Sequence, residues 1–309
     1  MRTLKFFLFG KFRIEVDAKV IQKIESRKAE ELLVYLLLYR DQPQSREQLA
    51  DILWMEIEPE QSKAYLRKAL WQLQTILESY GVQGMLLVDG EWLQVKPHFD
   101  FWLDIKVLEE AFSNTQGRRG KNLGEGQVKS IKDAMEIYRG ELMQGWYEDW
   151  CLYERERLQH LYLAMLDKLM DYCEAYGDYE NGLIYGEKIL QYDRARERTH
   201  RRLMRLHYLA RDRTAALRQY QKCVAALKEE LDVDPADRTH LLYEMIRTDK
   251  LETPAQPNRV GKNKGSETEE QLNILFSHLS TLHKSLSQIQ TQIAQDMQVI
   301  QKTIKNKQS

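Results

Sequence analysis

The sequence predicts a mainly α chain with four segments: a small α+β unit at residues 1–100, a helical-repeat domain at 101–250, a linker at 251–266 and a coiled-coil helix at 267–305. Three observations predict this class. Short aromatic and β-branched runs alternate with helical patterns in the first segment. The second segment has helical apolar spacing throughout and an internal repeat. The last has apolar residues at heptad spacing.

Composition limits the class of protein before any motif is considered. The 309 residues suffice for two ordinary domains and an appendage. The formal net charge of −1 means that any contact with nucleic acid needs a local basic patch. Three cysteines, far apart and without a C-x-x-C pair, indicate buried or idle thiols in a reducing cytosol. The apolar start of the chain is too short for a signal peptide or a membrane span, so we expect a soluble, cytoplasmic protein.

A hairpin and a helix open the α+β unit. Leu4–Phe9 and Phe12–Val16 are short strand-like runs, and the Gly-Lys pair that begins at Gly10 is a hairpin signal between them. The spacing becomes helical after Ser26, which has the chemistry of an N-cap. A leucine-rich apolar stripe follows and stops before Pro43. These patterns predict an antiparallel hairpin followed by a buried first helix.

Two further helices and a second hairpin complete this unit. Ser45 and Gln48 have the spacing of a capping box and predict a short second helix. After an acidic break, a third helix is predicted at Gln61–Ser79. Leu86–Val88 and Trp92–Val95 flank an Asp-Gly-Glu turn and predict a second hairpin. A capped short helix, a long helix and a hairpin in this order predict a winged helix-turn-helix, in which the long helix enters the major groove of DNA.

The second segment is predicted to be all-helical. Helices are expected at residues 104–112, 127–138, 148–176, 179–191, 197–210, 213–231 and 235–246. An offset of 34 residues aligns Leu169 with Leu203, and Gly182 with Ala216 at a position where two helices must approach closely. Helix pairs with this period are typical of tetratricopeptide (TPR) repeats, although the usual proline is missing at residues 191–194. We therefore predict a TPR-like α-helical repeat domain.

The C-terminal pattern predicts an oligomerisation helix. The linker contains proline, glycine and basic residues, which favour a flexible segment. Beyond it, apolar residues follow a heptad with one stutter between Ile289 and Met297. A lone helix cannot bury so narrow a seam, so we expect a coiled coil that joins chains into a homodimer or a higher oligomer. The seam residues expected at this contact are Leu275, Leu279, Leu282, Leu286, Ile289, Ile293 and Ile300.

The predicted third helix carries the candidate DNA-binding face. Its leucines form a core stripe, and polar or basic residues occupy the other side. Those residues are Lys68, Trp71, Gln72 and Thr75, with Lys63, Arg67 and Gln74 at the margin. Basic groups supply phosphate contacts, and glutamine can pair with an adenine edge. An ordinary solvated helix face is the alternative, but the position of the helix between a capped helix and a hairpin favours DNA.

Two features of the α+β unit leave alternatives open. Trp71 is a large aromatic residue that is turned away from the core stripe. It packs against the wing or a neighbouring domain, or it contacts a base or sugar of DNA. We favour packing. Arg27, Lys28 and Arg46 stand at the starts of predicted helices, where helix N-termini favour phosphate. They are candidates for contacts with the DNA backbone, and a plain solvated charge is the equal alternative for each.

Catalytic and cofactor-binding patterns are absent from the sequence. The histidines are scattered without an H-E-x-x-H motif, and neither G-x-S-x-G nor an ordered phosphate loop occurs. The aromatic residues of the predicted helices are more typical of a repeat-domain core than of a cofactor site. We therefore expect no enzyme activity, no cofactor, no metal ion and no membrane contact.

The sequence resembles a known family of regulators. Residues 1–100 resemble the OmpR/PhoB-type winged helix, and Leu66–Gln74 is similar to the recognition-helix segment of SARP-type activators. From Asp100 onward the chain resembles their bacterial transcriptional activator domain (BTAD), through segments that include Tyr138–Leu142 and Gly177–Tyr179. The resemblance covers about residues 4–247. It implies a transcription regulator, an activator in this family, that binds double-stranded promoter DNA at the nucleoid and contacts RNA polymerase or another protein through its repeats.

The sequence departs from this family in two places. Trp71 replaces the usual serine of the recognition segment, and Gln74 replaces its second arginine, which removes a phosphate or guanine contact. The predicted coiled coil also lies outside the family pattern. These departures, with the near-neutral charge, support an alternative function: a TPR-like protein-interaction scaffold whose winged helix does not bind DNA specifically.

Overall fold

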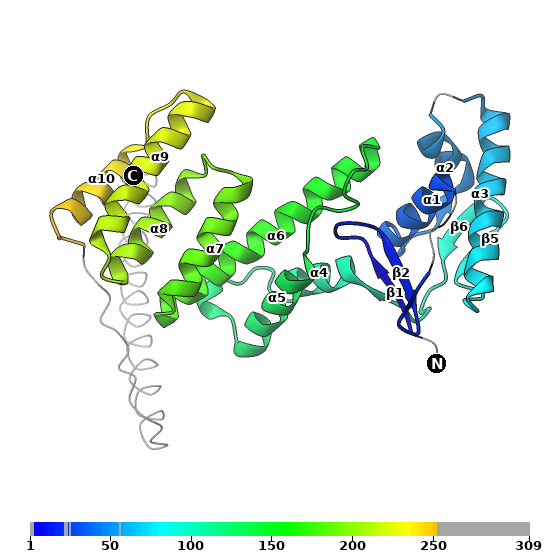
Figure 1. Cartoon of the computed structure of the whole chain (residues 1–309), viewed down its shortest axis with the longest axis horizontal. Coiled ribbons are helices and arrows are strands. Elements are labelled where there is room, and N and C mark those ends of the chain that lie inside the picture. The colour runs from blue at the N-terminus through cyan, green and yellow to red at the C-terminus, as the bar shows by residue number, and fades with distance from the viewer. Residues whose placement is uncertain (1–2, 22–23, 25, 56, 252–309) are drawn as a thin grey trace, which may run out of the picture. The chain divides into compact units, whose positions relative to one another are not determined.

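The computed structural model describes residues 3–21, 24, 26–55 and 57–251. It is mainly helical with two small N-terminal sheets, as the sequence predicts (Figure 1). The predicted linker and coiled coil, with all the seam residues from Leu275 to Ile300, lie outside the described residues. No described helix has the length and apolar character that a membrane span requires.

The first sheet is built around the predicted N-terminal hairpin. Its strand order is β3-β2-β1-β7, and the strands are β1 (Leu4–Phe7), β2 (Arg13–Val16), β3 (Lys19–Val20) and β7 (Trp102–Leu103). β1 and β2 pair antiparallel, with Phe6 opposite Ile14, and this confirms the hairpin. β7 pairs with β1 in parallel and brings the chain back to this sheet after the second hairpin. The sheet therefore ends where the helical segment begins.

Three helices and a second sheet form the rest of the winged helix. The helices are α1 (Arg27–Leu38), α2 (Arg46–Leu53) and α3 (Pro59–Ser79). The sheet has the order β4-β6-β5, with strands β4 (Gln44–Ser45), β5 (Leu86–Asp89) and β6 (Trp92–Val95). Ser26 caps α1 as predicted, because its Oγ accepts from the Ala29 N–H at 3.3 Å. Ser45 precedes α2 but makes no side-chain cap bond, so the predicted capping box does not form; Ser45 instead pairs with Trp92 in the sheet.

Residues 104–247 are helical. The elements are α4 (Asp104–Ser113), the 3₁₀ helix η1 (Gly120–Asn122), α5 (Glu125–Ile137), α6 (Asp149–Tyr176), α7 (Tyr179–Tyr192), α8 (Glu197–Leu209), α9 (Arg213–Leu231) and α10 (Asp237–Arg247). Consecutive helices pack side by side, α6 with α7 and α8 with α9 (Figure 1). A Cβ atom at Gly182 would lie 3.1 Å from Leu206 Cδ1 and 3.2 Å from Cys173 Cβ. These distances are shorter than ordinary van der Waals contacts, so the close approach of helices expected at this small residue is confirmed.

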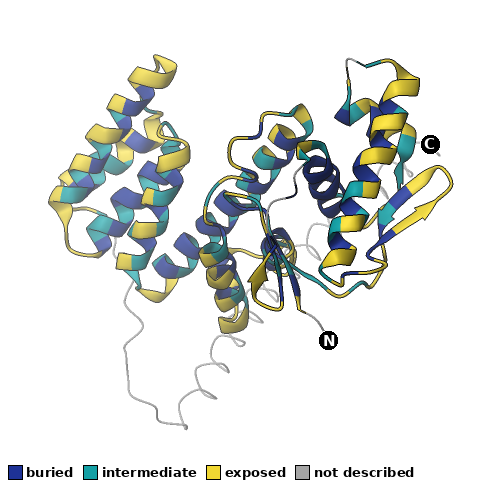
Figure 2. Ribbon diagram, turned by 45° about the vertical axis from the view of Figure 1, so that its right-hand side comes forward, coloured by how far each residue is buried: buried dark blue, intermediate teal, exposed yellow. Residues whose placement is uncertain are grey.

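One hydrophobic core extends from the winged helix into the helical segment. It contains Phe6 and Leu33 from the first, and Leu108 and Leu166 from the second (Figure 2). α1 lies within this core, and ten of its residues are buried, Ala29 to Leu38. The three thiols are buried and free, as expected, and burial raises the pKa of Cys151 to about 11. The winged helix is therefore packed against its neighbour through α1 and not tethered to it by a loop.

Candidate nucleic-acid interface

Helix α3 is the predicted recognition helix, and its inner side is fixed by packing. Pro59 stands in its first turn, where a missing N–H costs nothing, and the Ser62 hydroxyl donates to the Pro59 carbonyl at 2.9 Å. A stripe of leucines is buried against α1 and α2: Leu66, Leu70, Leu73 and Leu77. This stripe confirms the predicted core side, and it turns the opposite side of α3 outward.

The outward side of α3 is basic and aromatic. Arg67, Lys68, Trp71 and Thr75 are exposed, and their three- and four-residue spacing places them on one face. We call these four residues the α3 face. Gln72 and Gln74, which the sequence places among the DNA contacts, are half-buried. Within the described part of the chain, neither Arg67 nor Lys68 forms an ion pair, so both cations are available to an anionic partner.

Trp71 contradicts the packing expected for it. The side chain is 65% exposed, so neither the wing nor the helical segment covers it in the described structure. A tryptophan at the centre of an outward helix face exposes a large apolar surface to water, and no hydrophobic contact offsets that exposure. Of the two alternatives that the sequence leaves open, contact with an external partner is the one that the structure favours.

Lys63 lies beside the α3 face and is held by carboxylates. Its Nζ lies 3.2 Å from a Glu47 oxygen and 3.8 Å from a Glu60 oxygen. The hydrogen bond to Glu47 raises the pKa of the Lys63 ammonium, so this group stays charged. Its charge is already neutralised locally, which makes it a weaker phosphate ligand than Arg67 or Lys68.

Arg46, the first residue of α2, contacts the wing. Its guanidinium donates to the Gly90 carbonyl at 3.2 Å, and its backbone N–H donates to the Glu91 carbonyl at 2.8 Å. These bonds join the start of α2 to the β5–β6 turn. Arg46 therefore positions the wing relative to the helix pair, and its half-buried side chain has little freedom to reach a separate phosphate.

Arg27 and Lys28 are placed differently from the sequence prediction. The Arg27 guanidinium lies 3.7 Å above the Trp146 ring and 3.2 Å from a Glu148 carboxylate oxygen, so it contacts the helical segment. Lys28 Nζ lies 2.7 Å from Glu31. We therefore assign Arg27 to the interface between α1 and the start of α6, whereas Lys28 pairs within α1; DNA contact by either residue stays a prediction. The reason is long-range: Glu148 lies 121 residues away along the chain, beyond any local pattern.

Other interface residues were not identified from the sequence. The Tyr39 hydroxyl donates to Glu154 Oε1 at 3.0 Å, and Arg40 donates to Glu109 at 2.6 Å. Arg157 links these two contacts, because its guanidinium nitrogens lie 2.7 Å from a carboxylate oxygen of Glu109 and of Glu154. Glu154 is nearly fully buried, so its carboxylate is shielded from solvent. A buried acidic residue with tyrosine and arginine partners holds α1 at a defined position on α4 and α6.

The wing carries the opposite charge to the α3 face. Its turn exposes Asp89 and Glu91, with Gly90 between them at a positive φ of 49°. Leu87 and Trp92 are 38% and 49% exposed on its strands. An acidic turn is repelled by phosphates, so this hairpin is poorly suited to contact a DNA backbone. Any DNA contact therefore depends mainly on α3.

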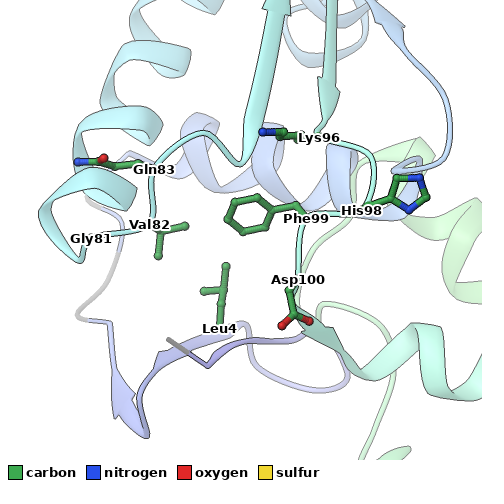
Figure 3. Close-up of a pocket in the computed structure, with 8 residues that line it drawn as sticks. All are labelled: Leu4, Gly81, Val82, Gln83, Lys96, His98, Phe99 and Asp100. Atoms are coloured by element: carbon green, nitrogen blue, oxygen red, sulfur yellow. The ribbon is translucent and has the colours of Figure 1, made fainter. Parts of the chain in front are cut away.

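Two cavities in the described structure lie away from the α3 face. One, of about 470 Å³, is lined by the α3–β5 and β6–β7 connections, and Figure 3 shows Leu4, Val82 and Phe99 pointing toward one another there. The other, of about 760 Å³, lies between the end of α2 and the start of α6, with Trp54 and Trp150 among its lining residues. No group of His, Cys, Asp and Glu in the described residues is arranged to hold a metal ion.

Two comparisons relate this chain to known proteins. Residues 103–247 match the bacterial transcriptional activator domain family. The fold is similar to a solved structure of Mycobacterium tuberculosis EmbR in complex with a low affinity phosphopeptide, with a TM-score of 0.63 and 18% sequence identity. That match covers 82% of this chain and 67% of the other. No curated protein matches the chain. The structural match shows a shared fold, and the domain match confirms the resemblance seen in the sequence.

Proposed function

Residues 103–247 match the bacterial transcriptional activator domain family, and from this match we propose that the chain is a SARP-type transcription regulator that binds promoter DNA through the α3 face. One observation carries the proposal. α3 presents unpaired Arg67 and Lys68 outward, and it stands between α2 and the β5–β6 hairpin. This is the arrangement in which a recognition helix enters the major groove.

The charges of the α3 face are suited to a duplex. An exposed arginine or lysine beside a groove binds phosphate oxygens, and arginine can also donate two hydrogen bonds to guanine. Each phosphate contact releases counterions, so affinity falls with salt by a logarithmic slope of about 0.9 per contact. A chain with a net charge of −1 gains little from its overall field, so these local cations dominate the salt dependence.

The test is an electrophoretic mobility shift with DNA from upstream of the chain's own gene, over a salt series. We expect a steep loss of affinity with salt for the full chain. Arg67→Ala combined with Lys68→Ala should weaken binding and reduce the logarithmic salt slope by about 2. As a matched control, Lys129→Ala with Lys132→Ala removes two exposed charges from α5 and should leave binding unchanged. Binding that is indifferent to salt and to the α3 variant contradicts the proposal.

The proposed regulatory output is activation. The helical segment is an activator domain by family, and its position beside the winged helix is fixed by the α1 interface. A bound regulator of this kind would present residues 103–247 to RNA polymerase or another protein from one defined orientation. In vitro transcription from the bound promoter should rise when the full chain is added, and a fall would indicate a repressor.

A protein-interaction scaffold is the second candidate function, and one observation favours it. The exposed Trp71 and the acidic wing turn are features of a protein-binding surface as well as departures from a DNA-binding one. On this alternative, the full chain binds no duplex above the level of its α3 double variant. The same mobility-shift series therefore separates the two functions.

A further inference from the structure

Trp71 occupies the centre of the α3 face. Arg67 precedes it by one helical turn and Thr75 follows it by one turn, so the three share a single stripe. With 65% of the side chain exposed, the indole would be the largest apolar surface on α3 to meet a partner. A DNA-binding helix with this arrangement presents an apolar group to the floor of the major groove, with the cations Arg67 and Lys68 one turn before it.

Few groups around Trp71 are free to form hydrogen bonds with base edges. The Thr75 hydroxyl donates to the Trp71 carbonyl at 2.8 Å, so its proton is already used within the helix. Gln72 and Gln74 are half-buried. Tryptophan itself has one N–H donor and no acceptor. Among the four residues of the α3 face, hydrogen-bond donation to base edges therefore falls mainly to Arg67 and Lys68, and the centre of the face offers apolar contact.

Base pairs expose one kind of apolar group in the major groove, the C5-methyl of thymine. We infer that Trp71 is a specificity-determining residue that packs on a thymine methyl group at the centre of each half-site. This inference rests on the proposed function, since it requires α3 to enter the groove. It adds a base identity to that function: a thymine beside the phosphate or guanine contacts of Arg67 and Lys68.

Deoxyuridine substitution tests the inference, because it removes the methyl group and keeps every hydrogen-bonding atom of thymine. A binding site is first selected from random duplex DNA with the full chain. Each thymine is then replaced by deoxyuridine, one position at a time. The full chain should lose about fourfold in affinity at one thymine per half-site, the size expected of one buried methyl group. The variant Trp71→Ala should bind thymine and deoxyuridine equally at that position.

Trp92→Ala is the matched control. It removes an exposed tryptophan from the wing, and the deoxyuridine effect should persist at full size. Equal thermal unfolding of Trp71→Ala and the unaltered chain confirms that the substitution acts on binding, as expected for an exposed side chain.

The possible results distinguish failure of the Trp71 contact from failure of the proposed DNA-binding function. Failure of the unaltered chain to bind any duplex overturns the proposed function and the inference together. Duplex binding that ignores every thymine methyl overturns the inference alone. So does a deoxyuridine effect of the same size in Trp71→Ala, because the methyl contact would then belong to another residue.

Discussion

Asp104 is a buried carboxylate at the junction of the sheet and the helical segment. It is 1% exposed, and its Oδ2 accepts from the backbone N–H groups of Leu8 at 2.6 Å and Phe9 at 2.8 Å. Burial raises its pKa to about 6, although the backbone hydrogen bonds act in the opposite direction. One side chain therefore satisfies two buried backbone donors where β1 ends.

We predict that Asp104→Ala lowers the free energy of unfolding by about 2–5 kcal/mol. The substitution leaves the Leu8 and Phe9 N–H groups buried without an acceptor, at about 1–3 kcal/mol for each group. Urea denaturation measures the change. Asp100→Ala is the control, because Asp100 is exposed and its loss should change the free energy by less than about 0.5 kcal/mol. Equal effects of the two substitutions would contradict the role assigned to Asp104.

The same carboxylate predicts a pH dependence of stability. Its folded pKa lies above the unfolded value of 3.8, so its contribution is fully present below pH 3.8 and is lost as pH rises through about 6. Between pH 4 and pH 7 the unaltered chain should lose about 2–3 kcal/mol of stability relative to Asp104→Asn. Burial also raises the pKa of Glu31. Because both chains contain Glu31, its contribution cancels in the difference between them. A difference that is flat with pH would show that Asp104 does not titrate in this range.

The 3₁₀ helix η1 is the element that depends most on a single small residue. A Cβ atom at Gly120 would lie 2.1 Å from the Lys168 carbonyl oxygen and 2.6 Å from Asp171 Cβ, both on α6. The Lys121 N–H donates to Asp171 Oδ2 at 2.9 Å, which fixes η1 against that helix. Because the nearest atom belongs to the backbone of α6, a larger residue at position 120 must displace one of the two elements.

Gly120→Ala should therefore lower the free energy of unfolding by about 1–3 kcal/mol through overpacking. Gly126→Ala provides the comparison, since a Cβ there meets open space within α5. That substitution should leave the stability unchanged or raise it by up to about 1 kcal/mol, because alanine favours a helix over glycine. Thermal denaturation of the two variants gives the measurement, and a stabilised Gly120→Ala would refute the close contact.

Helix lengths and positions were largely predictable from the sequence. The helices between residues 104 and 247 begin and end within a few residues of their predicted bounds, because each has a long amphipathic stripe and turn residues at its ends. β3, β4 and β7 were not predicted. Each has two residues, too few for any periodicity. β4 and β7 exist because a distant strand pairs with each of them, whereas β3 pairs with the adjacent β2.

For the whole molecule, the winged helix and the helical segment act as one body. α1 is buried in the shared core, and the network of Tyr39, Glu154 and Arg157 holds it to α6. Under the proposed function, DNA binding by α3 would hold residues 103–247 in one fixed orientation.

The C-terminal heptad pattern predicts that the chain forms oligomers. The heptad pattern of residues 267–305 lies outside the described residues and stays a prediction. We expect a chain ending at Leu251 to have a lower mass in light scattering than the full chain, with weaker binding to DNA that carries two half-sites. A full-length substitution of Leu279 and Leu286 by aspartate should reproduce the loss of mass. An unchanged mass in both cases would exclude the coiled coil as the oligomerisation element.

Local patterns were sufficient to predict the fold class, the order of the α-helices and the buried side of α3, because apolar periodicity records which side of a helix must face a core. They could not predict which neighbour covers a given residue. Arg27 at a helix start has the local signature of a phosphate ligand, and only folding shows that Trp146 and Glu148 occupy it. Trp71 is the converse case, since a tryptophan is expected to be covered and the tertiary structure leaves it exposed. Contacts between residues far apart in the chain depend on how whole elements pack, and no local spacing contains that information.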